Sequence, residues 1–244
     1  MMNKTLARSL TSLALAMALA LAVGGAQAAG VQISGWAYGA GNNVLAGTAA
    51  SRYTGPAGAL AGTLGGAVAQ DSAPFTTYSL ELGEAPGFEL VTPTDYTLVE
   101  GAQYFLSRRG DARIAERLGL LMTYAYDNPQ LVASADGSTA LQLAIWNVVY
   151  DTDDTVTANP YTTRRQAAKF SDASAFQAPA NALLAGSRNV LVSKYEIYAL
   201  ERSAAADLLF ARTSHDPTVP EPGSLLLAAS ALAAAAAVRR RRAC

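Results

Sequence analysis

Cysteine and histidine are almost absent from this chain. Among its 244 residues there is one cysteine, Cys244, and one histidine, His215. This scarcity excludes a disulfide scaffold and a four-ligand Cys/His zinc site, and we expect no metal site and no cofactor. Charged residues are also few, at 15%, whereas hydrophobic residues make up 51%, which excludes a disordered polyelectrolyte. The length allows one domain with terminal tails, or two small domains.

The N-terminal segment is basic and then apolar. Lys4 and Arg8 precede an apolar run over residues 13–23, and Ala26-Gln27-Ala28 follows it. A charged region, an apolar region and an A-x-A site in this order are typical of a secretory signal peptide. The run is too short for a membrane-spanning helix. We therefore predict export through the Sec translocon and removal of residues 1–28, with cleavage at the site formed by Ala26 and Ala28.

A second short apolar run, residues 225–238, lies near the C-terminus. A Pro-Glu-Pro triplet precedes it and an arginine cluster follows it: Pro220, Glu221, Pro222, Arg239, Arg240, Arg241 and Arg242. A helix over residues 223–238 would be about 24 Å long, which barely crosses the roughly 30 Å of bilayer hydrocarbon. The arginines would stay cytoplasmic by the positive-inside rule, so the triplet would lie on the far side.

This order of parts resembles the PEP-CTERM sorting signal of Gram-negative bacteria. The resemblance implies that residues 220–244 insert transiently into the inner membrane and are processed by an exosortase, a membrane cysteine protease-transpeptidase. It also implies a final location at the cell surface or in the exopolysaccharide matrix, with polysaccharide or another surface molecule as a partner. The alternative is an ordinary C-terminal anchor, which predicts the same orientation but gives no reason for the triplet.

Removal of both ends would leave an acidic body. Residues 29–222 carry 12 basic and 19 acidic side chains, a net charge of −7, and no cysteine. Such a charge argues against a protein that binds nucleic acid or an anionic membrane surface.

Residues 29–212 are predicted to form one α+β domain, followed by a linker over residues 213–219. Alternating β-rich residues predict strands over residues 31–38, 59–69, 75–82, 95–106, 189–200 and 208–210. Apolar residues at helical spacing predict helices over residues 111–126 and 138–150, and a looser one over 164–184 that is interrupted near Pro179. The order of strands, helices and strands favours a β-rich sandwich or barrel-like domain with a helical insertion at about residues 111–185.

Two segments of this domain resemble the halves of a bacterial thioester domain. Residues 75–84 form a predicted strand with aromatic residues, and residues 140–146 read Ala-Leu-Gln-Leu-Ala-Ile-Trp. The resemblance implies that a cysteine on the strand would condense with Gln142, while a helical subdomain lies between the two halves and Trp146 follows one turn later. This chain has Ser79 in place of that cysteine, so the implied site is degenerate and forms no thioester.

We predict that Ser79 and Gln142 form an unmodified, hydrogen-bonded pair and that Trp146 is packed in the core. An intramolecular Ser79–Gln142 ester, which would make the protein a covalent adhesin, is an alternative. A serine hydroxyl needs a base to become a nucleophile. Glu81, two residues further along the predicted strand and so on its same face, is the local candidate for that base.

Other acidic residues offer weaker candidates. Asp151, Asp153 and Asp154 resemble part of a calcium loop, but the glycine and the final glutamate of an EF-hand are missing. Glu81, Glu84 and Glu89 could supply the paired carboxylates of a secreted glycoside hydrolase. The leading hypothesis is an exported, non-enzymatic surface protein with no catalytic residues, and the hydrolase and the covalent adhesin are its alternatives.

Overall fold

A computed structural model describes residues 27–66, 73–83, 94–151, 153–156, 171–172, 175–203 and 205–214. Contacts within the chain divide it into two units, residues 1–212 and residues 213–244. Ala26 and the sorting segment 220–244 lie outside the described residues, and so does the helix predicted over residues 223–238. Among the residues that are described, no helix combines the length and apolar character needed to cross a membrane.

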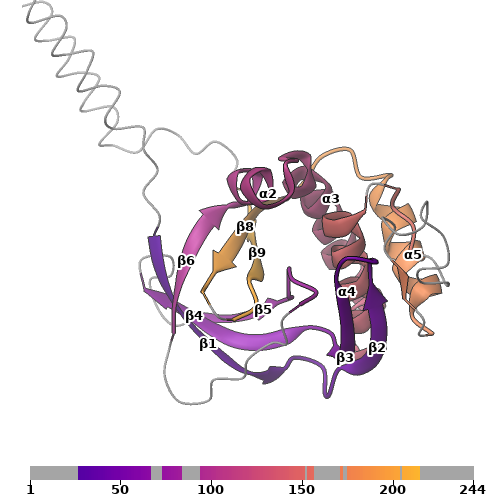
Figure 1. Ribbon diagram of the computed structural model, residues 1–244, viewed down its shortest axis with the longest axis horizontal. Coiled ribbons are helices and arrows are strands. Elements are labelled where there is room, and N and C mark those ends of the chain that lie inside the picture. The colour runs from indigo at the N-terminus through magenta and orange to yellow at the C-terminus, as the bar shows by residue number, and fades with distance from the viewer. Residues whose placement is uncertain are drawn as a thin grey trace, which may run out of the picture. The chain divides into compact units, whose positions relative to one another are not determined.

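The described strands form two sheets. The larger has six strands in the order β5-β4-β1-β6-β8-β9, and the smaller has three in the order β3-β2-β7 (Figure 1). Their bounds are β1 Gln27–Trp36, β2 Asn42–Gly47, β3 Arg52–Ala57, β4 Leu60–Gly66, β5 Ala73–Thr77, β6 Thr94–Glu100, β7 Ser171–Asp172, β8 Tyr195–Glu201 and β9 Leu208–Thr213. Ala28, the predicted cleavage position, pairs with Thr97 of β6.

The two edges of the larger sheet are joined just beyond the end of β5. Backbone hydrogen bonds of 2.8 Å connect residues 78–80 with residues 207–209. A register shift between Ile33 and Gly35 in β1 adds the local bend that such an irregularity produces. Because β5 pairs with β4 while the residues after it pair with the start of β9, the hydrogen bonding continues around the sheet, as in a barrel.

The helices lie between β6 and β8 in sequence, although these strands are neighbours in the sheet. Residues 97–100 of β6 pair with residues 198–201 of β8. The intervening helices are α2 Gly101–Arg109, α3 Arg113–Asp127, the short 3-10 helix η1 Pro129–Leu131, α4 Ala135–Tyr150 and α5 Gln177–Ser187. The presence of both strands and helices confirms the α+β class, and the helices form an insertion between two paired strands.

Helix α4 lies in the core of the insertion. Ser134 caps its N-terminus by accepting a hydrogen bond from Gly137 N at 3.0 Å. Of its 16 residues, 13 are buried, from Gly137 to Val149 without a break. A helix that is buried on every side is typical of a domain core. Burial of α4 therefore puts its polar side chains out of reach of bulk water; Gln142 finds partners inside the protein, whereas the Asn147 amide has none among the described residues.

The strand predicted over residues 95–106 is wrong in its second half. Strand β6 ends at Glu100, and α2 begins at Gly101. Tyr104 and Phe105 suggested a strand because aromatic residues favour strands, yet both are buried on the helix. A Cβ atom at Gly101 would lie 2.4 Å from the Ile197 carbonyl oxygen, so glycine lets α2 start in contact with β8. The helical region consequently begins about ten residues before the predicted boundary.

The strand predicted over residues 189–200 is also too long. Strand β8 begins at Tyr195, and Leu191 and Val192 are 93% and 76% exposed. The Ser193 hydroxyl accepts a hydrogen bond from Tyr195 N at 3.1 Å, which holds the chain in a turn just before the strand. A run of apolar residues thus forms a surface loop.

Two further differences concern small or short elements. The β2–β3 hairpin was not predicted, because Gly- and Ala-rich strands carry a weak pattern. Burial nevertheless alternates in β2, where Val44 and Ala46 are buried and Leu45 is 44% exposed.

The helix predicted over residues 164–184 is observed only from Gln177, with Pro179 in its first turn, where proline is tolerated. Residues 171–172 instead form β7, which pairs with β2. Residues 157–170 lie outside the described part of the chain.

Candidate functional site

Ser79 and Gln142 lie in direct contact although 63 positions separate them. Ser79 N donates a hydrogen bond to Gln142 Oε1 at 3.0 Å, and Gln142 Nε2 donates to the Ser79 carbonyl oxygen at 2.8 Å. Both residues are almost fully buried, with 3% and 2% of their surface exposed. The Gln142 side-chain amide therefore bonds to both the N–H and the carbonyl oxygen of Ser79, as the backbone of a neighbouring strand would.

The Ser79 hydroxyl is bonded to the main chain of Glu81. It donates to the Glu81 carbonyl oxygen at 2.9 Å and accepts from Glu81 N at 3.2 Å. The predicted strand 75–82 is wrong beyond Thr77, where β5 ends, and Ser79 forms an isolated bridge with Leu208. Ser79 and Glu81 therefore contact each other through a local turn-like hydrogen bond, which replaces the strand face on which we expected them.

The Glu81 carboxylate contributes to the join between this segment and β9. Its Oε2 atom accepts a hydrogen bond from Asp207 N at 3.3 Å. The Glu81 carboxylate is thus bonded to the main chain of Asp207, whereas the Ser79 hydroxyl is bonded to the main chain of Glu81. Glu84 and Glu89, the other candidate carboxylates, lie outside the described residues.

Trp146 lies one helical turn after Gln142 and is 2% exposed. Its ring packs against Tyr53, with ring centroids 5.1 Å apart and planes inclined by 56°. Trp146, Tyr53, Gln142 and Ser79 are among the residues that line a recess of about 10 Å³, which has room for about one water molecule. Within the described part of the chain, Trp146 Nε1 has no hydrogen-bond partner. The Ser79–Gln142 pair thus lies beside a narrow, aromatic-walled recess that is too small for a sugar ring.

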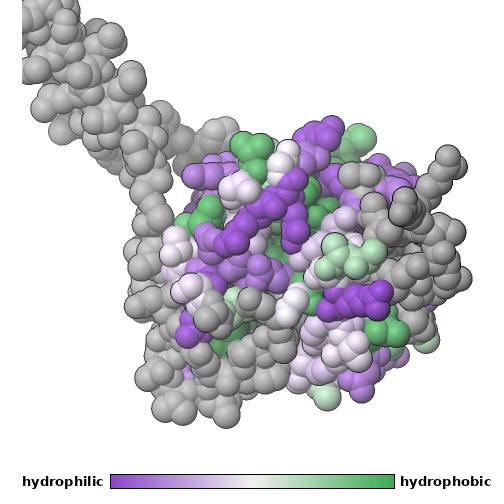
Figure 2. Space-filling view, in the orientation of Figure 1, coloured by the Kyte–Doolittle hydropathy of each residue, from purple (hydrophilic) through white to green (hydrophobic). Residues whose placement is uncertain are grey.

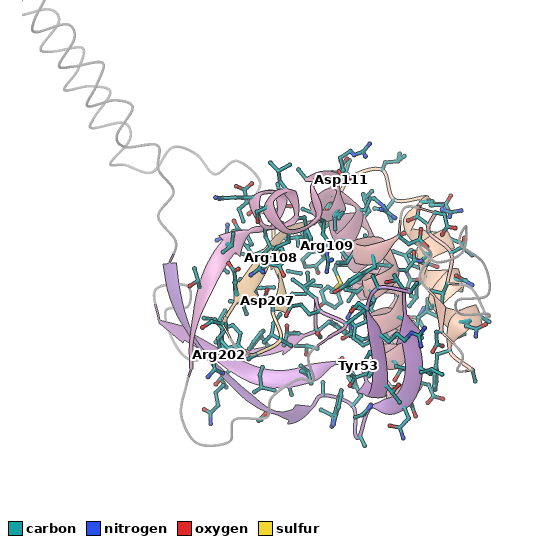
Figure 3. All side chains as sticks on the ribbon, in the orientation of Figure 1. Tyr53, Arg108, Arg109, Asp111, Arg202 and Asp207 are labelled. Atoms are coloured by element: carbon teal, nitrogen blue, oxygen red, sulfur yellow. The ribbon has the colours of Figure 1, made fainter. Side chains whose placement is uncertain are left out.

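A buried carboxylate just before β9, that of Asp207, was not predicted from the sequence. Asp207 is 2% exposed and accepts hydrogen bonds from the Tyr104 hydroxyl at 2.7 Å and from Arg202 N at 3.0 Å. Arg108 lies 3.9 Å from its Oδ2 atom and also pairs with Glu201 (Figure 3). The signal in the sequence was one acid between apolar residues, in Ala-Ala-Ala-Asp-Leu-Leu-Phe.

Burial raises the pKa of Asp207 above its ordinary value of 3.8, although the hydrogen bonds from Arg202 and Tyr104 oppose this shift. Burial, together with the bond to Asp207, also raises the pKa of Tyr104. Burial therefore makes the charged form of the Asp207 carboxylate less stable than it would be in water. Its hydrogen bond from Tyr104 links α2 to the start of β9.

Replacing Asp207 with asparagine should change how stability depends on pH. Because the folded-state pKa is raised, the folded chain binds this proton more tightly than the unfolded chain does. The resulting stabilisation is fully present below pH 3.8 and is lost as the pH rises through the folded-state pKa. We expect the free energy of unfolding of the native chain, relative to Asp207→Asn, to fall as the pH rises above about 4. Urea unfolding at a series of pH values measures it, and a difference independent of pH would contradict the expectation.

The candidate calcium loop is occupied by arginine side chains. Arg117 pairs with the Asp154 carboxylate and donates to the Asp151 carbonyl oxygen at 3.2 Å. Arg188 donates to the Asp154 carbonyl oxygen at 3.2 Å, with its Nε 3.7 Å from the carboxylate. No cluster of three or more potential metal ligands occurs in the part of the chain that the structure describes. The guanidinium groups supply the positive charge next to Asp154 in this structure.

A comparison with known protein families finds a match at the C-terminus. Residues 218–242 match the family described as the PEP-CTERM protein-sorting motif. This match confirms the resemblance drawn from Pro220, Glu221, Pro222 and the arginine cluster. The chain therefore carries a PEP-CTERM sorting signal, which implies export to the cell envelope or surface and an exosortase as processing partner. No curated protein and no solved structure matches the chain. The thioester-domain resemblance lies outside the matched residues and stays a prediction.

Proposed function

We propose that this protein is an exported, non-enzymatic surface protein whose domain is a binding or structural module of thioester-domain type with an unreactive site. In this proposal the Sec translocon exports the chain and residues 1–28 are removed. The C-terminal helix then holds the protein transiently in the inner membrane until an exosortase processes it. The domain finally resides at the cell surface or in the exopolysaccharide matrix. The matched sorting motif supports the export and processing steps.

The hydrogen bonding of Ser79 carries the proposal that the site is unreactive. A serine attacks a carbonyl carbon only when a base removes its proton. The Ser79 hydroxyl donates to a backbone carbonyl oxygen, which cannot hold that proton as a base. Gln142 in turn uses both ends of its amide to bind the Ser79 backbone. The pair satisfies its own polar groups, which is what a structural role for a buried amide requires.

Two alternative functions can be separated from this one by direct measurement. A covalent adhesin would contain a Ser79–Gln142 ester, which intact-mass spectrometry detects. A carboxylate-dependent glycoside hydrolase would release sugars from matrix polysaccharide, which an assay of the purified protein detects. The bond from Asp207 N to the Glu81 carboxylate supports a structural role for Glu81 rather than an acid–base role.

The mature protein should lack the arginine tail. A helix over residues 223–238 would be a marginal span, so we expect the chain to be retained in the membrane only until cleavage. Mass spectrometry of surface-extracted and secreted protein should find C-termini that precede Arg239. The matched control is a chain with Pro220, Glu221 and Pro222 replaced by alanine, which should keep the tail. If most of the native extracted protein still carries Arg239 to Arg242, the segment is a permanent anchor.

A further inference from the structure

A second pocket, of about 210 Å³, lies where the ends of α2 and α4 meet the first turns of α3. This volume is below the roughly 300–1,000 Å³ of sites for drug-sized molecules, so the pocket suits one small ligand group. One wall is apolar and consists of Ile114, Val148 and Val149. The pocket is distinct from the recess beside Ser79. Tyr150, which lines the pocket, accepts a hydrogen bond at 3.1 Å from the backbone N–H of Leu82, three residues after Ser79.

Arg109 lies at this pocket with its guanidinium group stacked on an aromatic ring. Its guanidinium carbon lies 4.0 Å from the centroid of the Tyr150 ring, and no carboxylate pairs with it within the described residues. Stacking on an aromatic ring fixes the plane of a guanidinium group and leaves its N–H edges available. Figure 3 labels Arg109 and Asp111 at the junction of α2 and α3, and in Figure 2 hydrophilic side chains cross the centre of this face beside hydrophobic ones.

The other arginine side chains nearby already have acidic partners. Arg113 makes two bonds of 2.9 Å to the Asp111 carboxylate. Arg117 pairs with Asp154 and donates to the carbonyl oxygens of Val148 and Asp151. These contacts fix the pocket walls without a ligand, so among the described residues that line the pocket, Arg109 is the positioned cation without an acidic partner.

We propose that this pocket binds an acidic sugar, a uronate residue of a polysaccharide, with its carboxylate on Arg109. A guanidinium edge binds a carboxylate through two parallel N–H···O bonds. In this proposal the sugar ring lies against the small exposed part of the apolar wall, with its hydroxyls within reach of the carboxylates of Asp111 and Asp151. The inference rests on the proposed function, because that function places the domain among matrix polysaccharides.

The test measures binding of a defined oligogalacturonate to the mature secreted protein by titration calorimetry. Arg109→Gln should weaken binding at least about tenfold, as expected when a hydrogen bond to a charged group is lost. Arg109→Lys keeps the charge without the planar fork and should weaken binding severalfold. The matched control is Arg212→Gln, since Arg212 also stacks on a tyrosine, Tyr198, at 4.8 Å, but has Glu196 as its partner. That variant should bind like the native protein.

Several results would overturn the inference. Equal weakening by Arg109→Gln and Arg212→Gln would show diffuse charge attraction, and equal binding of acetate or of a neutral oligosaccharide would remove the acidic-sugar specificity. Binding of a peptide carboxylate with no binding of the oligogalacturonate would assign the pocket to a different partner, and no binding at all would leave it without a ligand. These outcomes do not affect the mass of the tail or of the Ser79–Gln142 pair, so failure here differs from failure of the proposed function.

Discussion

Replacing Trp146 with alanine is expected to lower the free energy of unfolding by about 3–5 kcal/mol, as for other large-to-small changes at buried aromatic residues. The indole is 2% exposed, packs on Tyr53 with ring centroids 5.1 Å apart, and belongs to a helix whose residues are buried from Gly137 to Val149. Close-packed neighbours on that helix cannot collapse into the space left by the ring. Denaturant unfolding of the native and variant proteins measures the difference.

Two matched variants show whether this loss comes from ring packing. Trp36→Ala removes the other tryptophan, which is only partly buried, and should cost less. Trp146→Phe keeps an aromatic ring and removes Nε1, which has no partner among the described residues, so it should also cost less than alanine. A loss below about 1 kcal/mol for Trp146→Ala would mean that the indole is not packed as the structure shows, since surface changes cost about that little.

Replacing Ser79 with cysteine is expected to create a thioester with Gln142 and to lower the intact mass by about 17 Da, while the native chain shows no deficit and captures no methylamine. In this step the thiol sulfur attacks the Gln142 side-chain carbonyl carbon, the C–N bond breaks, and the nitrogen leaves as ammonia with the thiol proton. Intact-mass spectrometry of the folded proteins, before and after methylamine treatment, measures both outcomes.

The geometry around Ser79 supplies the physical reason for this expected gain. Ser79 N–H donates to Gln142 Oε1 at 3.0 Å, which polarises the carbonyl that the nucleophile would attack. The serine hydroxyl is bonded to both backbone groups of Glu81, whereas a thiol forms weaker hydrogen bonds and is freer to turn toward Gln142. Thiols are also the better nucleophiles near neutral pH.

The control for this prediction is a Ser79→Cys, Gln142→Ala double variant, which has the thiol without the carbonyl and should show no mass deficit. A deficit in the native chain that disappears in Ser79→Ala would replace the unreactive site by an ester-forming one. A Ser79→Cys protein that folds and keeps its full mass would show that the contact between the two residues is structural alone, and the thioester-domain resemblance would then lose its chemical basis.

Local sequence patterns were sufficient to predict an element where its surroundings in the fold agree with its local preference. Helix α3 has apolar residues at helical spacing and ends at Asp127, before Asn128 and Pro129. Helix α4 has an N-cap serine and a long apolar stretch, and both helices were predicted at nearly their observed positions. The sorting motif could also be read locally, because its proline triplet, apolar run and arginine cluster are contiguous in the chain.

Patterns failed where contacts from distant segments override local preference. Tyr104 and Phe105 favour a strand, but Gly101 allows close packing on β8, and the chain turns into α2. Leu191 and Val192 are apolar but find no core to enter, so they form an exposed loop. Strand β5 ends at Thr77 because the residues after it leave the β4 pairing and bond to β9 instead.

The sequence by itself determined that the chain carries a sorting signal, which implies export, and that its domain mixes strands and helices. It also indicated that Ser79 and Gln142 form a hydrogen-bonded pair. Only the tertiary structure decided that the Ser79 hydroxyl bonds to Glu81, that Asp207 is a buried carboxylate bonded to Tyr104, and that Arg109 stacks on Tyr150. The physical reason is that the hydrogen bonds and burial of a side chain depend on which distant segments meet it. Residues 79 and 142, or 104 and 207, become neighbours only after the sheet closes and the helical insertion packs against it.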